Sequence, residues 1–194
     1  RGTRQISRFF FHGAIPLSMT QKIRKQIKAE QVIDYYVRNK QFFEQFEPKR
    51  TAEFFSLDYQ RAILRDEMRC GQERTAFRFY IKPVGEPKKI IGIIGLNHVV
   101  WGAFCSAFLG YKLDKHYINK GYMSMAVELL AAYAFEKLHL HRIEANVMPK
   151  NRASLRVLEK NCFINEGTSK YYLKINGKWE DHIHMVKINY EMHT

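Results

Sequence analysis

The sequence predicts an α/β fold in which helices cover both faces of a mixed central sheet. Three observations support this prediction. Strand-like and helix-like stretches follow one another in the order β-α-α-β-β-β-α-β-α-β-β. Residues 108–138 pass from a strand through a short basic loop into a helix. An Asn-Gly pair at 176–177 separates two strand-like stretches and predicts a β-hairpin.

Length and composition indicate one globular domain. A chain of 194 residues with 46% hydrophobic content can bury a sizeable core, and no apolar run approaches the ~20 residues that span a membrane. Cys70, Cys105 and Cys162 are scattered and form no CxxC motif. They predict reduced thiols in a cytoplasmic protein, without a metal site.

The first residues are difficult to assign. We interpret residues 1–20 as an extension or a non-native remnant that could lead into an edge strand, and residues 21–194 as a single domain. The approximate alternation of Gln21–Lys28 predicts the first strand.

Two helices are predicted next. The first begins at Ala29 and ends before Pro48, because proline cannot continue a helix. The second covers residues 51–70 and ends at Gly71. Its predicted inward residues are Phe55, Tyr59, Ala62 and Ile63.

The remaining elements follow from apolar runs between turn residues. Strands are predicted at 76–82, 90–99, 103–113, 141–147, 164–175 and 182–190. A short helix is predicted at 151–160, with Leu155, Leu158 and Cys162 on one face. The central helix carries an inward stripe of Met123, Ala126, Val127, Leu130, Ala134 and Leu138.

The start of this central helix is suited to an anion. Its first backbone N–H groups have no partner within the helix, and the helix dipole adds partial positive charge there. Lys115 and Lys120 add full charges nearby, so a phosphate or pyrophosphate is the expected guest. The loop contains neither the nucleoside-triphosphate motif nor the dinucleotide motif.

Residues 118–123 resemble the pyrophosphate loop, Gln/Arg-x-x-Gly-x-Gly/Ala, of the GNAT acetyltransferases, although only Gly121 matches. Residues 151–163 resemble a second GNAT motif, N-x-x-S-x-x-(V/L)-x-E-K-x-G-F, with Cys162 at the usual glycine. The resemblance extends from about Ala29 to Tyr190 and implies a GNAT fold. Three stretches resemble the Rim-type ribosomal-protein-alanine N-acetyltransferases in particular: 34–48, 141–149 and 177–182.

The resemblance implies where acetyl-CoA would bind. The pyrophosphate would lie on the backbone amides of Asn119, Lys120, Gly121, Tyr122, Met123 and Ser124. The edge of a splayed strand at Tyr111 and Leu113 would receive the pantetheine arm and the acetyl carbonyl, and Asn151 and Ser154 would contact the cofactor. The alternatives are an ordinary helix start, a normal core strand and simple helix capping.

The resemblance also implies catalytic roles. Ser154 would protonate the leaving thiolate, and the strand at Tyr111 would stabilise the oxyanion. An α-amino group has a pKa of ~8, so a water chain to Glu144 could suffice as the base. A salt bridge between Glu144 and a neighbouring Arg or Lys is the alternative.

The acceptor groove in this fold is flanked by loops that here hold Phe46, Glu47, Trp179, Asp181 and His182. An acidic residue there could receive a positive α-amino group. The His182-x-His184 pair has no evident third ligand, so we expect no metal.

The leading hypothesis is transfer of acetyl from acetyl-CoA to the N-terminal amine of a protein, plausibly a ribosomal one, by direct attack in a ternary complex. One alternative is a GNAT enzyme that acetylates a small amine such as an antibiotic, polyamine or amino acid. Another is a non-catalytic, CoA-responsive RNA-binding protein, which only the net charge of +13 supports. In the leading hypothesis this charge would favour contact with ribosomes and RNA.

Overall fold

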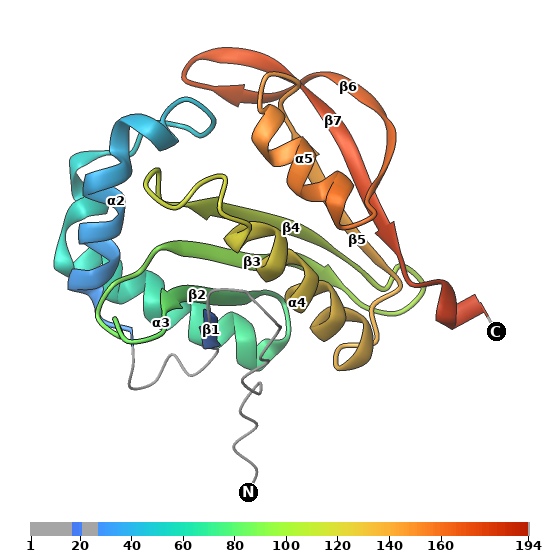
Figure 1. Cartoon of the computed structure of the whole chain (residues 1–194), viewed down its shortest axis with the longest axis horizontal. Helices are drawn as coiled ribbons and strands as arrows, with labels where there is room; N and C mark the ends of the chain where they lie inside the picture. The colour runs from blue at the N-terminus through green and yellow to red at the C-terminus, as the bar shows by residue number, and fades with distance from the viewer. Residues whose placement is uncertain (1–16, 21–26, 194) are drawn as a thin grey trace, which may run out of the picture.

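A seven-stranded mixed sheet forms the centre of the computed structural model, which describes residues 17–20 and 27–193 (Figure 1). The strand order is β1-β2-β3-β4-β5-β7-β6, and every neighbouring pair is antiparallel except β4 and β5. The strands are β1 (Leu17–Thr20), β2 (Phe77–Pro83), β3 (Gly92–Val100), β4 (Ser106–Leu113), β5 (Arg142–Val147), β6 (Ile164–Ile175) and β7 (Lys178–Ile188). The predicted mixed sheet is confirmed.

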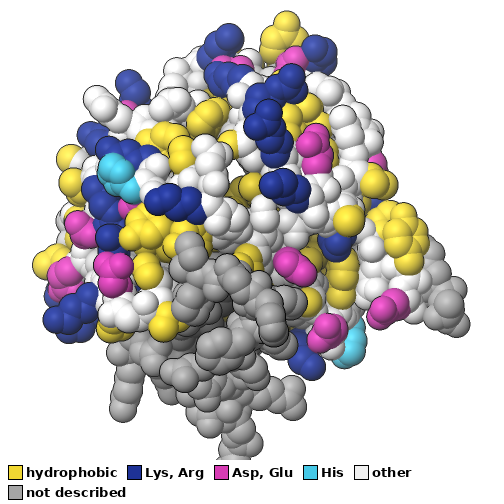
Figure 2. All heavy atoms as spheres, viewed as in Figure 1, with side chains coloured by type: hydrophobic (Ala, Val, Ile, Leu, Met, Phe, Trp, Pro, Cys, Tyr) yellow, Lys and Arg dark blue, Asp and Glu magenta, His cyan; other side chains and the backbone are white. Residues whose placement is uncertain are grey.

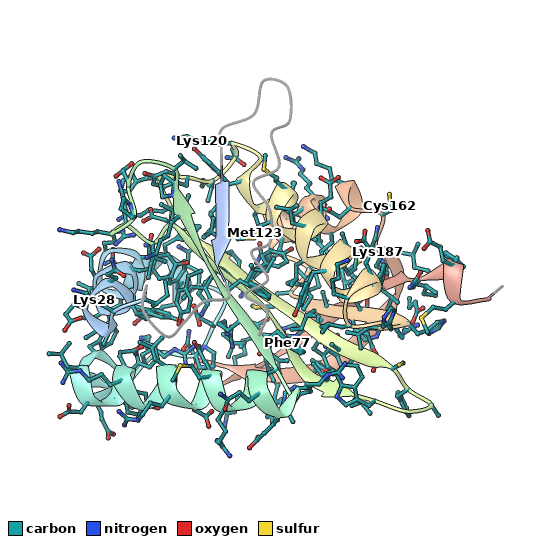
Figure 3. All side chains as sticks on the ribbon, turned by 90° about the horizontal axis from the view of Figure 1, so that it is seen from below. Lys28, Phe77, Lys120, Met123, Cys162 and Lys187 are labelled. Carbon is teal, nitrogen blue, oxygen red and sulfur yellow. The ribbon has the colours of Figure 1, made fainter. Side chains whose placement is uncertain are left out.

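Helices cover both faces of this sheet (Figure 3). They are α2 (Ala29–Phe43), α3 (Leu57–Glu73), α4 (Tyr122–Glu136) and α5 (Arg152–Lys160), with short 3-10 turns η1 (Ala52–Phe55) and η2 (Tyr190–His193). Helices α4 and α5 enclose the larger core against one face, and α2 and α3 enclose a smaller one on the other.

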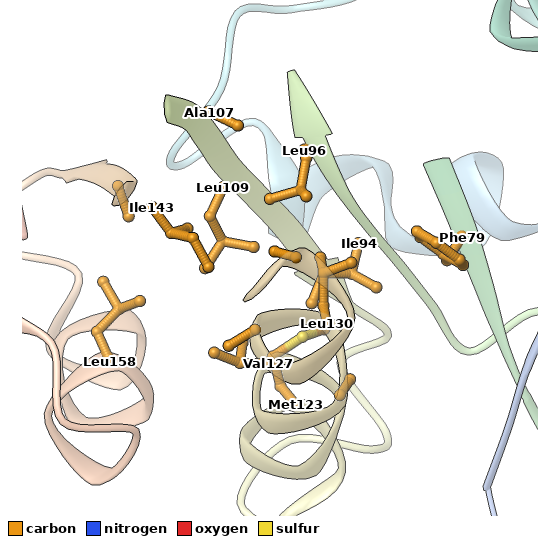
Figure 4. Packing of buried hydrophobic residues seen from close by; sticks show 14 of the residues in the cluster. Phe79, Ile94, Leu96, Ala107, Leu109, Met123, Val127, Leu130, Ile143 and Leu158 are labelled. Atoms are coloured by element: carbon orange, nitrogen blue, oxygen red, sulfur yellow. The ribbon is translucent and has the colours of Figure 1, made fainter. Parts of the chain in front are cut away.

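Helix α4 packs along the middle of the sheet (Figure 4). All six residues of its predicted stripe are buried: Met123, Ala126, Val127, Leu130, Ala134 and Leu138. They lie under strand residues such as Ile94, Leu96 and Leu109, with Leu158 of α5 beside them. The periodicity therefore predicted this helix and its buried face correctly.

The second predicted helix is wrong in its limits. Residues 52–55 form η1, and α3 begins only after Ser56, whose Oγ accepts the N–H of Tyr59 at 3.3 Å. Gly71 does not end α3, which continues to Glu73. Arg74 ends it instead by adopting a left-handed conformation, with φ of 60°.

The predicted inward face of this helix is only partly right, because Phe55 and Ile63 are half-buried. Tyr59 and Ala62 are exposed, whereas Gln60 and Leu64 are buried. Burial of Gln60 is tolerated because its side-chain amide donates to the carbonyl of Phe54 at 2.7 Å. A buried polar residue cannot be recognised from hydrophobic spacing.

Cys162 is a further correction. It is exposed, and its φ of 60° places it in the turn after α5, while Phe163 is buried in the position expected for it. All three cysteines are free thiols. The Asn-Gly hairpin is confirmed, with left-handed φ values of 50° at Asn176 and 87° at Gly177.

The N-terminal predictions are partly outside the described residues. Residues 21–26 of the predicted first strand are not described, and Ile27 and Lys28 lie in neither a helix nor a strand. The edge strand suggested before them is present as β1, which pairs with β2. Within the described ranges, no helix combines the length and apolar character needed to cross a membrane.

Candidate active site

The sheet opens between β4 and β5. The two strands are paired only where Ser106–Phe108 lies beside Arg142–Glu144, and beyond this point the described residues form no further ladder pairs between them. The N–H of Asp114 bonds the carbonyl of Ile91 on the β3 side at 2.8 Å. Because backbone groups alternate along a strand, the N–H groups of Leu113 and Tyr111 face the opening.

The loop from β4 to α4 is anchored by Asp114, whose side chain is almost fully buried. Its carboxylate accepts from Arg38 Nε at 2.6 Å and from the N–H of His116 at 3.0 Å. Burial alone would raise the pKa of Asp114, but these hydrogen bonds outweigh it and lower the pKa below its ordinary value. Asn39 adds a bond from the Lys115 N–H at 3.0 Å. Helix α2 thus fixes the loop that precedes α4.

The start of α4 has the features of an anion site. Gly121 is the N-cap, with φ of 81°, and a Cβ there would meet no atom within 4 Å. The N–H of Met125 is the first bonded to the carbonyl of Gly121, so those of Tyr122, Met123 and Ser124 precede the helical hydrogen bonds. These three donors and the open space before them fit a pyrophosphate.

Asn119 and Lys120, two predicted residues of this loop, directly precede Gly121. Asn119 has a left-handed φ of 59°. The Nζ of Lys120 donates to the carbonyl of His116 at 2.9 Å and lies 5.5 Å from the centre of the Tyr117 ring. Lys120 therefore adds positive charge on the loop itself.

Ser154 and Tyr111 meet across the opening. Their hydroxyl oxygens are 2.8 Å apart, and the Tyr111 hydroxyl also lies 3.1 Å from the carbonyl of Ser154. A carbonyl only accepts, so Tyr111 donates to it and Ser154 can donate to Tyr111. Burial raises the pKa of Tyr111, which keeps the phenol protonated. Asn151 is the N-cap of α5, and its side chain accepts the N–H of Ser154 at 3.1 Å.

Glu144 lies where the strands begin to separate, but it is not a free base. One carboxylate oxygen is 3.3 Å from Nε of Arg142, and the other is 2.7 Å from Nε2 of His184. Nδ1 of His184 lies 2.7 Å from Oδ1 of Asn146, whose amide nitrogen donates to the hydroxyl of Tyr172 at 3.0 Å. The salt bridge considered as an alternative is therefore present.

The loop after α2 borders the same region. Glu47 accepts from Lys112 of β4 at 2.5 Å and from Arg50 at 2.8 Å, so this predicted acceptor-binding carboxylate is already paired. An open cavity of about 440 Å³ is lined by Gln45 and Phe46 of this loop and by Lys150 of the loop after β5. This cavity therefore lies beside Phe46, one of the predicted acceptor-binding residues.

The predicted residues of β7 do not form one cluster. Side chains alternate along a strand, so Trp179 and Asp181 lie on one face and His182 on the other. Asp181 is paired with Lys170 at 2.7 Å, and Trp179 is exposed. His182 is buried, with Nδ1 3.0 Å from the carbonyl of Glu180. Among the described residues, no group of three or more His, Cys, Asp or Glu could hold a metal ion.

Three residues that form hydrogen bonds around this site were not predicted as site residues: Lys112, Asn176 and His184. Asn176 accepts the N–H of Lys49 at 2.8 Å and donates to the carbonyl of Glu44 at 2.7 Å, so the β6–β7 turn is fastened to the loop after α2. The partners of each are distant in sequence, and no local pattern indicates them. For His184, alternation with His182 was the only available signal.

A family model described as an acetyltransferase (GNAT) domain matches residues 24–164. The chain belongs to the GNAT acetyltransferase family. Its order of elements, its open β4–β5 pair and the exposed start of α4 are consistent with this assignment.

Individual relatives of this GNAT chain are also acetyltransferases. The probable N-acetyltransferase YjcK of Bacillus subtilis is 40% identical over 154 residues, which cover 79% of this chain and 84% of YjcK. The [ribosomal protein uS5]-alanine N-acetyltransferase of Escherichia coli is 34% identical over 155 residues, covering 80% and 79%. The ribosomal-protein-S5-alanine acetyltransferase structure from Vibrio fischeri has a TM-score of 0.83, with 32% identity, covering 94% and 97%.

These relationships establish the chemistry at the level of the enzyme class. The GNAT chain is an acetyltransferase. Other proteins with this fold have been solved in complex with CoA or acetyl-CoA. The identity of the acceptor is a separate question.

Proposed function

We propose that this enzyme transfers acetyl from acetyl-CoA to the N-terminal α-amine of a protein, with a ribosomal protein as the favoured acceptor. The observation that carries the proposal is the separation of β4 from β5 beyond Phe108 and Glu144, with the start of α4 beside it. The identity of about a third to uS5-alanine N-acetyltransferases supports this class of acceptor. We propose the cytoplasm as its location on the same basis.

In this proposal, the backbone of the opening binds acetyl-CoA. The amides of Tyr122, Met123 and Ser124 would hold the pyrophosphate, and the free N–H groups of Tyr111 and Leu113 would face the pantetheine arm and the acetyl carbonyl. Donors fixed in a strand need no rearrangement when negative charge develops on that oxygen. Acetyl-CoA supplies the activated acetyl group.

The transfer is a direct attack. A neutral amine would form a bond to the carbonyl carbon as the carbon–sulfur bond breaks. The thiolate would take a proton from Ser154, which contacts Tyr111, and Ser154 would regain a proton from water. The proton lost by the amine leaves through water towards Glu144. Arg142 and His184 hold the Glu144 carboxylate in place, where it can accept this proton.

The test is thiol release from acetyl-CoA with a peptide that begins with Ala, compared with the same peptide blocked at its N-terminus and with spermine and free amino acids. We expect turnover on the free peptide only, with the acetyl group located on the α-nitrogen by mass spectrometry. Turnover on small amines alone would contradict the proposed acceptor. Salt-sensitive RNA binding without any turnover would favour the non-catalytic alternative.

A further inference from the structure

His184 lies between two residues of β5 that share one face of the sheet, Glu144 and Asn146. Its Nε2 is 2.7 Å from Oε2 of Glu144, and its Nδ1 is 2.7 Å from Oδ1 of Asn146. Both contacts have the length of a strong hydrogen bond, so both ring nitrogens are held in place. The ring cannot turn without losing both.

The hydrogen bonds determine which nitrogens carry protons. A carboxylate only accepts, so Nε2 carries a proton and donates to Glu144. With its amide oxygen at Nδ1 and its nitrogen at Tyr172, Asn146 can accept a proton from Nδ1 as well. This placement of the amide suits a positively charged imidazolium.

A second arrangement is available to the same atoms. If Nδ1 loses its proton, a half-turn of the Asn146 amide directs its nitrogen at Nδ1 and its oxygen at Tyr172, whose hydroxyl can donate instead of accept. Nε2 still donates to Glu144 in this neutral state. Both states satisfy every hydrogen bond, and they differ in charge but not in the position of Glu144.

Among the described residues, few charged groups lie close to the His184 ring. From β5 it faces Glu144, which also contacts Arg142. On β6, Glu166 interacts electrostatically with His184 and is itself paired with Arg142, while Tyr172 contacts Asn146 and His182. His182 lies on the same face of its own strand. Loss of the imidazolium charge removes one of the two positive groups that contact the Glu144 carboxylate and leaves Arg142 as the other, so a proton that reaches Glu144 meets less electrostatic repulsion.

We infer that His184 is a positioning residue that orients Glu144 in both protonation states, and that protonation of His184 slows acetyl transfer. The inference rests on the proposed role of Glu144 as the final acceptor of the amine proton.

The first experiment compares His184→Gln with the wild-type enzyme from pH 5.5 to 9. A glutamine can donate an amide N–H to Glu144 but cannot become charged. An amine acceptor must also lose a proton, so we expect the logarithm of kcat/KM to rise with a slope of about 2 at low pH in the wild type and about 1 in His184→Gln. A slope of about 2 in the variant would overturn the inference.

A second variant tests orientation. His184→Leu removes the donor, and we expect kcat to fall by at least about tenfold while the affinity for acetyl-CoA, measured by calorimetry, stays unchanged. His139→Asn is the matched control, because His139 is exposed in a turn where its φ of 54° suits asparagine. Full kcat in His184→Leu would contradict the orienting role.

Nuclear magnetic resonance provides a readout that does not need turnover. In the nitrogen spectrum of the wild-type imidazoles, assigned by loss of one signal set in His184→Gln, we expect Nε2 to stay protonated from pH 5 to 9 while Nδ1 loses its proton. Loss of the proton from Nε2 instead would overturn the inference. The kinetic tests use any acceptor that the wild type acetylates, so a small-amine acceptor would refute the proposed function without deciding the role of His184.

Discussion

Asn151 and Ser154 combine a helix cap with the proposed site. Asn151 caps α5 by accepting the N–H of Ser154, which is the structural role considered from the sequence. This cap fixes the first turn of α5 and leaves the Ser154 hydroxyl directed at Tyr111. The cap is therefore compatible with the proposed catalytic role, because the two would use different atoms of Ser154.

The first prediction concerns this pair. We expect Ser154→Ala to lower kcat by about 100-fold through loss of the proton donor, with little change in acetyl-CoA affinity. Tyr111→Phe should lower kcat by less, because Ser154 remains, and should cost about 1 kcal/mol of unfolding free energy. Steady-state kinetics and urea unfolding check both. If Ser154→Ala retained full kcat, another group or water would have to protonate the thiolate.

The second prediction concerns Asp114. Its pKa is lowered in the folded state, so its ionised form stabilises the fold above the unfolded pKa of about 3.9, and this contribution is lost as the pH falls through the folded pKa. Asp114→Asn should therefore lose about 2–3 kcal/mol at pH 7, where a charged hydrogen bond to Arg38 is removed. Urea unfolding at pH 7 and pH 3 should show the difference shrinking at low pH. An equal difference at both values would mean that ionisation of Asp114 is not responsible.

At the scale of elements, the site depends on where β4 stops pairing with β5 and where α4 begins. The strand separation exposes backbone donors, and the N-cap glycine leaves three amides directed away from the helix. Both features are made of backbone. This explains why Ile118 and Met123 can differ from the family motif while the loop keeps its form.

The third prediction compares two glycines. Gly121 and Gly102 both have positive φ, of 81° and 74°, and a Cβ on either would meet no atom within 4 Å. Replacing each by alanine should cost about 1–2 kcal/mol of stability through the same backbone strain. Only Gly121→Ala should also weaken acetyl-CoA binding, by about tenfold or more, in a calorimetric titration. Equal affinities in the two variants would exclude α4 as the pyrophosphate site.

At the scale of the whole molecule, the cations behind the net charge of +13 differ in whether they are paired with carboxylates. Many cations are paired with carboxylates, whereas Arg152, Arg156 and Lys160 lie exposed along α5 without a salt bridge to any described residue. Figure 2 shows Lys and Arg side chains gathered over this region. We expect this helix face to be the part of the surface that contacts RNA.

The fourth prediction follows from counterion release. Binding of single-stranded RNA should weaken as salt increases, and Arg152, Arg156 and Lys160 changed together to Gln should reduce the slope of log K against log salt by about 2. The matched control changes Arg61, Arg65 and Arg69 on α3, two of which are paired with carboxylates. Fluorescence anisotropy across a salt series measures both. Equal slopes in the two variants would assign no special role to α5.

Local patterns predicted most of the fold. Apolar spacing identified α4, and the Asn-Gly pair identified the last hairpin, because neighbouring residues decide both. The pairing of carboxylates could not be predicted, since Glu47 and Lys112 are 65 residues apart and Glu144 meets His184 only through the register of β5 with β7. The limits of α3 were mispredicted because Ser56 caps its start and Arg74, rather than Gly71, ends it.

The hydrogen bonds of Asn176 in the β6–β7 turn affect how an acceptor could reach the opening between β4 and β5. Together with the Glu47–Lys112 pair and the β5–β7 ladder, it links the loop after α2 to both strands of the opening. The loop after α2 is therefore fastened on both sides of the opening. We expect a chain end to reach the opening more readily than the middle of a polypeptide, which would have to break one of these contacts.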